Sequence, residues 1–278
     1  MHNKYLRLFQ NSIAFMLGNL GSKLITFVML PLYTYKLSTS EFGVTDLVQT
    51  TVNLLLPICF LSVSDAVLRF TMDRQENDKE IFTNGCITTA LATIAIFVFS
   101  IIVNAMGVKY VFYVAGILFL QGLQSLLSQF SKAIGHVKVF AVNGTLLTLI
   151  TAISNLCLLL WLNLGVAGFF WSILIGLIVS NLYLMLRLNL WKYFDLSLFR
   201  PSKLQQMFQY SIPMISNAIA WWSSSEINRY YILYLLGTAA NGIFAVSNKL
   251  PSVVSLVTSI FFQSWQISAI EEFDSKDK

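Results

Sequence analysis

The chain has 278 residues, of which 56% are hydrophobic and only 11% are charged, and its mean hydropathy is +0.69. A soluble domain carries about 25% charged residues, because polar groups must cover its surface. The composition therefore excludes an ordinary soluble domain and predicts a protein whose surface faces lipid. The net charge of +5 comes from basic residues scattered between apolar runs. Because they form no patch, nucleic acid is not expected as a partner.

Eight apolar runs are long enough to cross a bilayer, which takes about 20 residues in a helix. They cover residues 11–33, 47–68, 83–104, 110–131, 139–162, 166–187, 208–236 and 242–265. The sequence thus predicts an all-α integral membrane protein with about eight transmembrane helices. No small-residue cleavage pattern follows the first run, so we expect it to be retained rather than removed as a signal peptide.

The basic residues between the runs are distributed unequally. If the N-terminus is cytoplasmic, only Lys36 and Lys109 lie on the opposite side, and Lys23, Arg229 and Lys249 fall inside runs. All the other basic residues are then cytoplasmic, and the positive-inside rule places both termini in the cytoplasm. The external loops are expected to be short, at residues 34–46, 105–109, 163–165 and 237–241.

An internal repeat divides the chain. A shift of 199 residues places Phe9, Gln10, Ser12, Ile13, Tyr35, Leu37, Thr39 and Gly43 on Phe208, Gln209, Ser211, Ile212, Tyr234, Leu236, Thr238 and Gly242. The seventh helix therefore resembles a second copy of the first, as in transporters built from two parallel bundles. We expect a six-helix lobe over residues 1–190, a cytoplasmic linker over 191–207, and the start of a second lobe with a polar tail over 208–278. Because the repeat implies six helices in each lobe, we expect an incomplete transporter, either truncated or a fragment.

Several charged residues lie inside the predicted helices, where a charge at the centre costs about 2.5–3.5 kcal/mol. Lys23 shares a helix face with Asn19 and Thr26, and Lys249 begins a polar stripe on the eighth run. Each lysine could face a hydrated cavity, or it could extend to the membrane interface.

Two further pairs have the spacing of neighbours on one helix face. Glu226 precedes Arg229 by one turn, so the two could form a structural ion pair or a functional one. Asp65 and Arg69 are four residues apart, and a structural clamp is favoured over a ligand site. Uncharged polar stripes on other helices include Gln121 and Asn155. Stripes on several helices predict a common hydrated interior with mostly positive fixed charge.

Enzyme chemistry is poorly supported. Cys59, Cys86 and Cys157 lie in apolar runs without metal-ligand spacing, and His2 and His136 are the only histidines. The chain has no P-loop and no dinucleotide-binding motif. We therefore expect no metal, no cofactor and no enzymatic activity.

The order of several short motifs resembles bacterial polysaccharide (O-antigen and capsule) flippases. The segments Pro31–Ser38 and Glu41–Gly43 resemble the end of the first helix in that family, and Ser64–Phe70 resembles the close of the second. Ser211–Pro213, Asn228–Tyr231, Leu236–Gly237 and Gly242–Leu250 resemble the seventh and eighth helices. One departure is Asn228, since the family often has Asp immediately before the helix-7 arginine.

The resemblance implies a fold related to the multidrug and toxin extrusion transporters. It implies a flippase that turns undecaprenyl-pyrophosphate-linked oligosaccharide across the bacterial inner membrane, with a polysaccharide polymerase and other assembly proteins as partners. Cationic side chains can replace the lost hydration of a pyrophosphate. We therefore expect Lys23, Arg229 and Lys249 to contact the head group, and Asn19, Gln121 and Asn155 to contact sugar hydroxyls.

Three alternatives remain open. A cation-coupled multidrug exporter of the same fold is disfavoured because Glu226 is the only acidic residue well inside a predicted helix. A membrane enzyme, such as a glycan polymerase or an acyltransferase, is disfavoured by the short external loops. The chain could also lack activity on its own, since its last helices would expose a face meant for absent partners.

Overall fold

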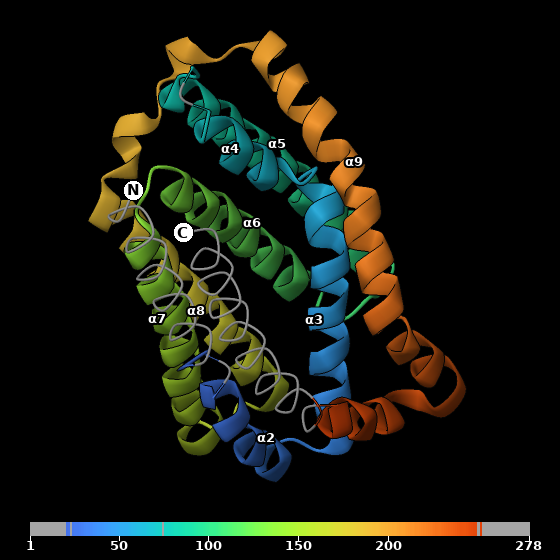
Figure 1. The fold of residues 1–278 in the computed structure, drawn as a ribbon. Helices are drawn as coiled ribbons and strands as arrows, with labels where there is room; N and C mark the ends of the chain where they lie inside the picture. Colours follow the sequence, from blue (N-terminus) through green and yellow to red (C-terminus); the bar gives the residue numbers. More distant parts are fainter. Residues whose placement is uncertain (1–20, 23, 74, 249–250, 252–278) are drawn as a thin grey trace, which may run out of the picture.

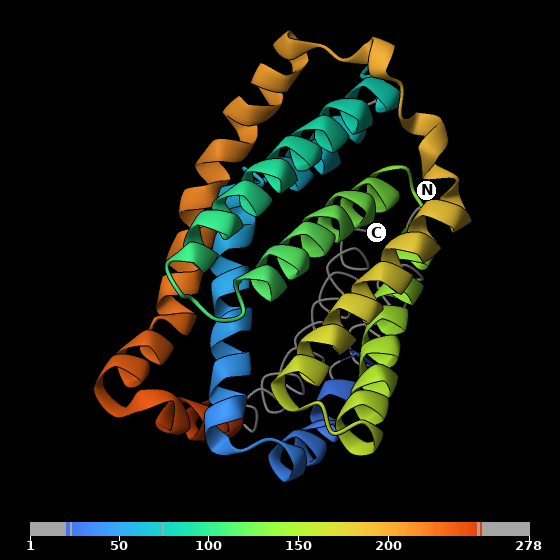
Figure 2. The ribbon, with the colours of Figure 1, turned by 180° about the vertical axis from the view of Figure 1, so that it is seen from behind.

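A computed structural model of the chain describes residues 21–22, 24–73, 75–248 and 251, and every regular element in these ranges is helical. The elements are α2 (Leu30–Lys36), α3 (Thr39–Cys59), α4 (Val63–Thr71), α5 (Asp78–Ala105), α6 (Val111–Ala133), α7 (Val137–Asn155), η1 (Leu156–Trp161), α8 (Gly165–Leu188), η2 (Leu190–Tyr193), η3 (Leu196–Leu198) and α9 (Pro201–Glu226). A last helix, Asn228–Asn248, follows α9. Two views of the ribbon place α3 and α9 along one edge, α7 and α8 along the other, and α6 between them (Figures 1 and 2).

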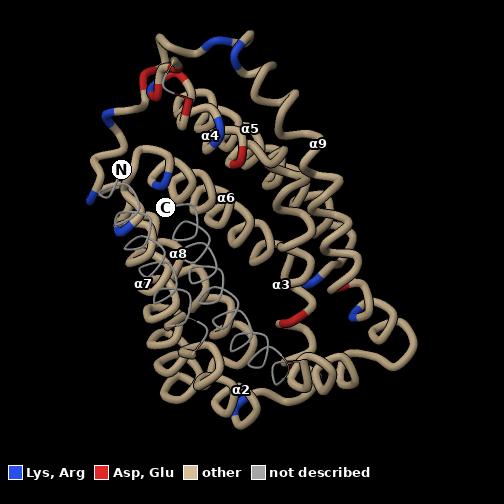
Figure 3. Tube along the Cα trace, in the orientation of Figure 1, with Lys and Arg blue, Asp and Glu red and all other residues tan. Residues whose placement is uncertain are grey.

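Six of the described helical segments are long and apolar enough to cross a membrane: α3, α5, α6, Val137–Trp161, α8 and Asn228–Asn248. Charged residues gather mainly at the end of the bundle where α4 ends and α5 begins, and a small group lies beside α3 and the end of α9 (Figure 3). Long apolar helices with charges collected at an end are what a bilayer requires. The prediction of an all-α, multi-pass membrane protein is confirmed.

The first correction concerns the start of the second predicted helix. We expected a loop at residues 34–46, but α2 reaches Lys36 and α3 begins at Thr39. Ser38 and Glu41 form a capping box, in which each side chain accepts a hydrogen bond from the other residue's backbone N–H. This box satisfies two of the first amide donors and starts the helix earlier than hydropathy indicates. Asp46 therefore lies inside α3.

The predicted second helix, 47–68, is also interrupted. Pro57 lies in the last turn of α3, and Leu61 and Ser62 have positive φ angles of 52° and 48°. Proline removes a helical hydrogen bond, and two left-handed residues turn the chain before α4 begins. Behind this break the ring of Phe60 lies against Gly122 of α6, where a Cβ atom would overlap the ring.

The second correction concerns the linker and the seventh helix. The linker, predicted at 191–207, ends earlier because α9 begins at Pro201, a residue that suits the first turn of a helix. The seventh run, predicted at 208–236, breaks at Ile227 and continues as Asn228–Asn248. The expected loop at 237–241 is therefore helical, although Gly237 has a φ of +84°.

The linker is fastened to the first half of the chain. The side chain of Thr83 on α5 accepts a hydrogen bond from the backbone of Asp195 at 3.0 Å. Lys203 of α9 forms an ion pair with Glu76 at 2.8 Å, and the ring of Tyr210 meets Phe70 edge-on. Through these contacts α9 lies along α4 and α3, so the C-terminal end of α9 reaches the beginning of α3.

Candidate functional site

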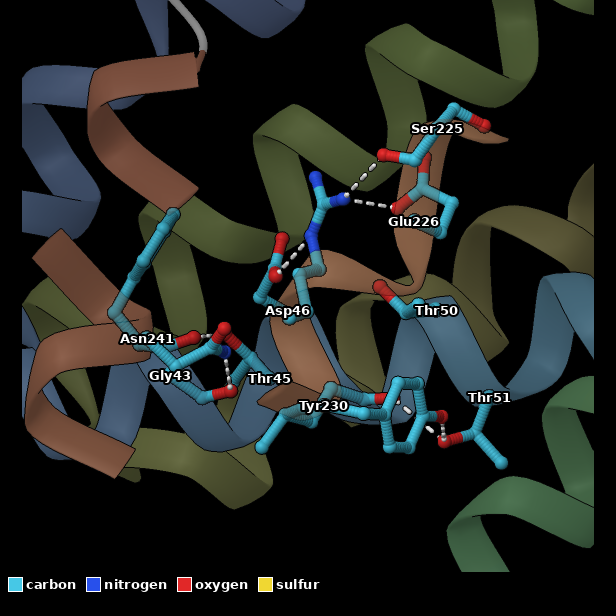
Figure 4. Close-up of polar contacts among 12 residues, drawn as sticks. Gly43, Thr45, Asp46, Thr50, Thr51, Ser225, Glu226, Tyr230 and Asn241 are labelled. Carbon is cyan, nitrogen blue, oxygen red and sulfur yellow. Dashed lines mark hydrogen bonds and ion pairs between the residues drawn. The ribbon is translucent and has the colours of Figure 1, made fainter. Parts of the chain in front are cut away.

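A buried ion-pair cluster joins the beginning of α3 to the end of α9. The guanidinium of Arg229 donates through Nε to Asp46 Oδ2 at 2.6 Å, and its Nη1 forms an ion pair with Glu226. The same Nη1 donates to the carbonyl oxygen of Ser225 at 3.5 Å (Figure 4). The side chains of Arg229 and Asp46 are only 11% and 10% exposed. Arg229 is therefore paired with two carboxylates in this conformation.

Asp46 is the functional candidate that sequence analysis missed. The hydropathy pattern places it in a loop, whereas the structure places it two turns into α3 and buries it. Two sequence signals point to its setting. The Ser38–Glu41 spacing marks the start of a helix, and the resemblance described above implies an acidic partner for the arginine that Asn228 does not supply. Asp46 supplies that partner from another helix.

The repeat-related positions Thr39, Gly43, Thr238 and Gly242 lie against one another next to this cluster. A Cβ atom on Gly43 would overlap the carbonyl oxygen of Thr238, and a Cβ atom on Gly242 would overlap the carbonyl oxygen of Thr39. These reciprocal contacts are those expected when two copies of a unit meet about a local two-fold axis. Only glycine lets the two helix backbones approach so closely.

Hydrogen bonds extend this contact on both sides. The hydroxyls of Ser40 and Thr238 share a hydrogen bond of 2.8 Å, and the fully buried Asn241 donates through Nδ2 to the carbonyl oxygen of Gly43 at 3.2 Å (Figure 4). Further along α3, the hydroxyls of Thr51 and Tyr230 lie 2.7 Å apart. We call the contact formed by Thr39, Ser40, Gly43, Asp46, Arg229, Thr238, Asn241 and Gly242 the seam.

A cavity of about 210 Å³ with a mainly apolar wall and several polar side chains lies beside the seam, between the helix that contains α2 and helices α3, α7 and α8. Asp46 forms part of its wall, and so does Asn155, whose Nδ2 donates to the hydroxyl of Tyr33 at 3.1 Å. The remaining polar side chains of the lining are Thr26, Thr45, Gln49, Thr148 and Thr151. A cavity of this size with several hydroxyl and amide groups is large enough for a few water molecules.

The structure brings together only part of the predicted site. Arg229 and Glu226 meet at the seam, and Asn155 lines the neighbouring cavity. Gln121 lies on α6 and is not part of that lining. The predicted contacts Lys23, Asn19 and Lys249 lie outside the described residues.

The predicted clamp between Asp65 and Arg69 is not formed. Asp65 Oδ1 instead accepts a hydrogen bond from Gln129 Nε2 of α6 at 3.3 Å. Within the ranges that the structure describes, the side-chain ion pairs are Lys203–Glu76, Arg229–Asp46 and Arg229–Glu226. Because α6 offers an amide directly opposite Asp65, packing between helices replaces the pairing along one helix.

Within the part of the chain that the structure describes, no three His, Cys, Asp or Glu residues lie close enough together to hold a metal ion. The cluster at the seam has two carboxylates with an arginine between them, and that arginine satisfies both by ion pairing. In this conformation the arrangement can hold two helices together, and with one carboxylate displaced it could bind an anion.

Several solved structures with a similar fold are described as transporters. The MATE multidrug transporter DinF-BH matches with a TM-score of 0.73 at 14% identity, over 93% of this chain and 63% of that one. The outward-facing form of a multidrug resistance MATE family transporter of the MOP superfamily matches with a TM-score of 0.61 at 15% identity, over 91% of this chain and 66% of that one. A MOP superfamily transporter from Pyrococcus furiosus, described by the reverse polarity of its binding pocket, matches with a TM-score of 0.58 at 16% identity, over 91% and 66%.

The chain therefore has the fold of a multi-pass membrane protein, and this fold is similar to that of MATE transporters. No curated protein matches the chain. The family model described as polysaccharide biosynthesis protein matches residues 8–265. The chain belongs to this family, and the predicted resemblance to polysaccharide flippases and MATE transporters is confirmed. It spans 63% of the length of DinF-BH.

Proposed function

We propose that the protein is a flippase that moves undecaprenyl-pyrophosphate-linked oligosaccharide across the inner membrane for surface polysaccharide synthesis. Both termini lie in the cytoplasm in this proposal, so the seam is at the external end of the bundle. The family match over residues 8–265 supports polysaccharide synthesis as the process. The MATE-like fold supports movement of a cargo across the bilayer.

The observation that carries the proposal is the burial of Arg229 between two halves of the chain. Arginine is costly at membrane depth and is retained where it meets a partner or a hydrated cavity. Its planar guanidinium matches the oxygens of a phosphate group. A pyrophosphate that crosses between the two halves would therefore meet a cation at the point where they touch. The lipid tail would remain in the bilayer while the head group moves.

A complementation experiment tests this proposal. The chain is expressed in a bacterial strain that lacks its own polysaccharide flippase, and surface polysaccharide is measured. We expect export with the parent chain and with Arg187→Gln, a change at an exposed residue near the end of α8. We expect strongly reduced export with Arg229→Gln and partial export with Arg229→Lys, because lysine keeps the charge but loses the planar pair of donors. Equal export by the parent and Arg229→Gln would contradict the proposed role of the arginine.

A second candidate is a cation-coupled multidrug exporter, and one observation favours it. The guanidinium of Arg229 at the seam is paired with two carboxylates, those of Asp46 and Glu226. Carboxylates inside a membrane are the groups that bind protons or cations. Drug resistance and polysaccharide export measured in the same strain separate the two functions. Resistance without export would favour the exporter.

A further inference from the structure

The cation proposed to meet the cargo is not free in this structure. Arg229 holds Asp46 through Nε and Glu226 through Nη1; the side chains of Arg229 and Asp46 are largely buried, whereas that of Glu226 is partly exposed. Carboxylate and phosphate oxygens make the same kind of charge-assisted hydrogen bond with a guanidinium. An arriving phosphate must therefore take the place of a carboxylate at Arg229.

The two carboxylates differ in what they connect. Glu226 lies three residues before Arg229, so the two move together as parts of one segment. Asp46 comes from α3, 183 residues away in the sequence. Loss of the Asp46 contact alone would remove the ion pair between α3 and the helix Asn228–Asn248. Among the described residues, one further ion pair reaches the first half of the chain, Lys203–Glu76, and it lies near the start of α9.

We propose that Asp46 acts as a built-in substitute for the phosphate of the cargo, and that an anionic head group releases the seam by displacing Asp46 from Arg229. Asp46 is thereby a positioning residue that couples arrival of the cargo to separation of α3 from the Asn228–Asn248 helix. This inference rests on the proposed function, because it requires an anionic cargo.

The cavity beside the seam supplies a place for the displaced carboxylate. A buried carboxylate without partners is strongly disfavoured, so the exchange needs alternative donors for Asp46. The wall that contains Asp46 also contains the amide of Gln49 and the hydroxyls of Thr26 and Thr148, and the 210 Å³ of space has room for water. Asp46 can therefore turn from the guanidinium to polar groups on its own side of the seam.

The rest of the seam is suited to opening as a unit. The glycine pair makes close backbone contact but forms no interlocking side-chain packing. Two hydrogen bonds accompany it, between Ser40 and Thr238 and from Asn241 to the Gly43 carbonyl. These groups are polar, so water can satisfy them once the helices separate.

Cysteine cross-linking across the seam tests the inference. Ser40→Cys and Thr238→Cys are introduced together into a chain in which Cys59, Cys86 and Cys157 are replaced by alanine. The two hydroxyls lie 2.8 Å apart, which places short side chains in reach of a disulfide. Ser64→Cys with Ser125→Cys is the matched control, because these hydroxyls are 2.9 Å apart and both lie in the first half of the chain. The rate of disulfide formation with copper phenanthroline is measured in detergent.

The probe is undecaprenyl pyrophosphate, and undecaprenol serves as the uncharged control. We expect undecaprenyl pyrophosphate to slow cross-linking of the seam pair about fivefold or more, a typical size for coupling between sites, and to leave the control pair unchanged. Asp46→Asn should slow the seam pair without any lipid, and Asp46→Glu should restore the rate. Glu226→Gln should leave the rate without lipid near that of the parent, since Glu226 does not connect the two helices.

Two results would overturn the assignment of Asp46. One is an Asp46→Asn chain whose seam pair cross-links at the parent rate, provided its control pair also does so. The other is an equal effect of undecaprenol and undecaprenyl pyrophosphate. These outcomes are distinct from failure of the proposed function. If export depends on Arg229 but cross-linking does not respond to undecaprenyl pyrophosphate, the proposed flippase function stands and the Asp46 assignment fails. If cross-linking responds to undecaprenyl pyrophosphate but no polysaccharide is exported, the flippase function fails, and only the displacement of Asp46 by an anionic lipid head group stands.

Discussion

Replacing Gly43 by alanine adds one methyl group at the point where α3 touches the helix Asn228–Asn248. The new Cβ would overlap the carbonyl oxygen of Thr238 and would lie 3.0 Å from the amide nitrogen of Gly242. Both neighbours are backbone atoms, so no flexible side chain can move aside. The helices themselves must separate, and we expect the change to weaken the closed seam.

The size of the effect follows from two opposing terms. Overpacking of this kind costs about 1–3 kcal/mol, which corresponds to about a 5- to 150-fold shift of an equilibrium. Alanine is favoured over glycine inside a helix by about 0.5–1 kcal/mol. That gain is present whether the seam is closed or open, so it does not offset the overlap in the equilibrium between the two. It does partly conceal the overlap in measurements of global unfolding.

The assay is therefore disulfide formation between cysteines at positions 40 and 238, with thermal unfolding in detergent as a second measurement. Gly144→Ala is the control, because Gly144 lies on α7 and nothing comes within 4 Å of the Cβ position there. We expect slower cross-linking with Gly43→Ala and no change with Gly144→Ala. The double change Gly43→Ala with Gly242→Ala should cost less than the sum of the single changes, since one separation relieves both overlaps. Unchanged cross-linking in Gly43→Ala would refute the reasoning.

Three further predictions concern the polar contacts. Arg229→Gln should lower the free energy of unfolding by about 3–5 kcal/mol, because it leaves buried Asp46 without its cation. The added change Asp46→Asn should recover part of that loss. Thermal unfolding of the single and double variants measures both effects, and a double variant less stable than Arg229→Gln would contradict the prediction. Thr51→Val and Tyr230→Phe should each cost about 1 kcal/mol but should not add, because both remove the same hydrogen bond of 2.7 Å; additive losses in a double-mutant cycle would count against that bond. In the linker, the side chain and then the backbone of Ser197 donate to Asp195 and hold the pKa of that carboxyl below its usual value, with a smaller contribution from Lys79. Because the folded-state pKa is lowered, the stabilisation is present above the unfolded-state pKa and is lost as pH falls through the folded-state pKa. Asp195→Asn should therefore make unfolding less sensitive to acid between these two pKa values. An unchanged dependence of unfolding on acid would contradict this prediction.

The sequence predicted single residues and pairs of the candidate site, but not how they come together in space. The spacing of Glu226 and Arg229 predicted that they could pair, and they do. The repeat identified Gly43 and Gly242 as equivalent positions, but equivalence does not imply contact. Their contact depends on how α9 lies along α3 and α4, which is decided by interhelical packing. Asp65 illustrates the same limit, because its partner on α6 is not a neighbour in the sequence.

By itself the sequence determined that this is an all-α membrane protein of the polysaccharide biosynthesis family. Hydropathy is summed locally over about 20 residues, so spans can be recognised without knowing which helices touch. The order of the short motifs along the chain likewise indicated the family. Only the tertiary structure decided that Asp46 belongs to a helix, that it holds Arg229, and that two glycines of the repeat meet face to face. Ion pairs and close backbone contacts depend on distances of a few ångströms between segments nearly 200 residues apart, and those distances are set by packing.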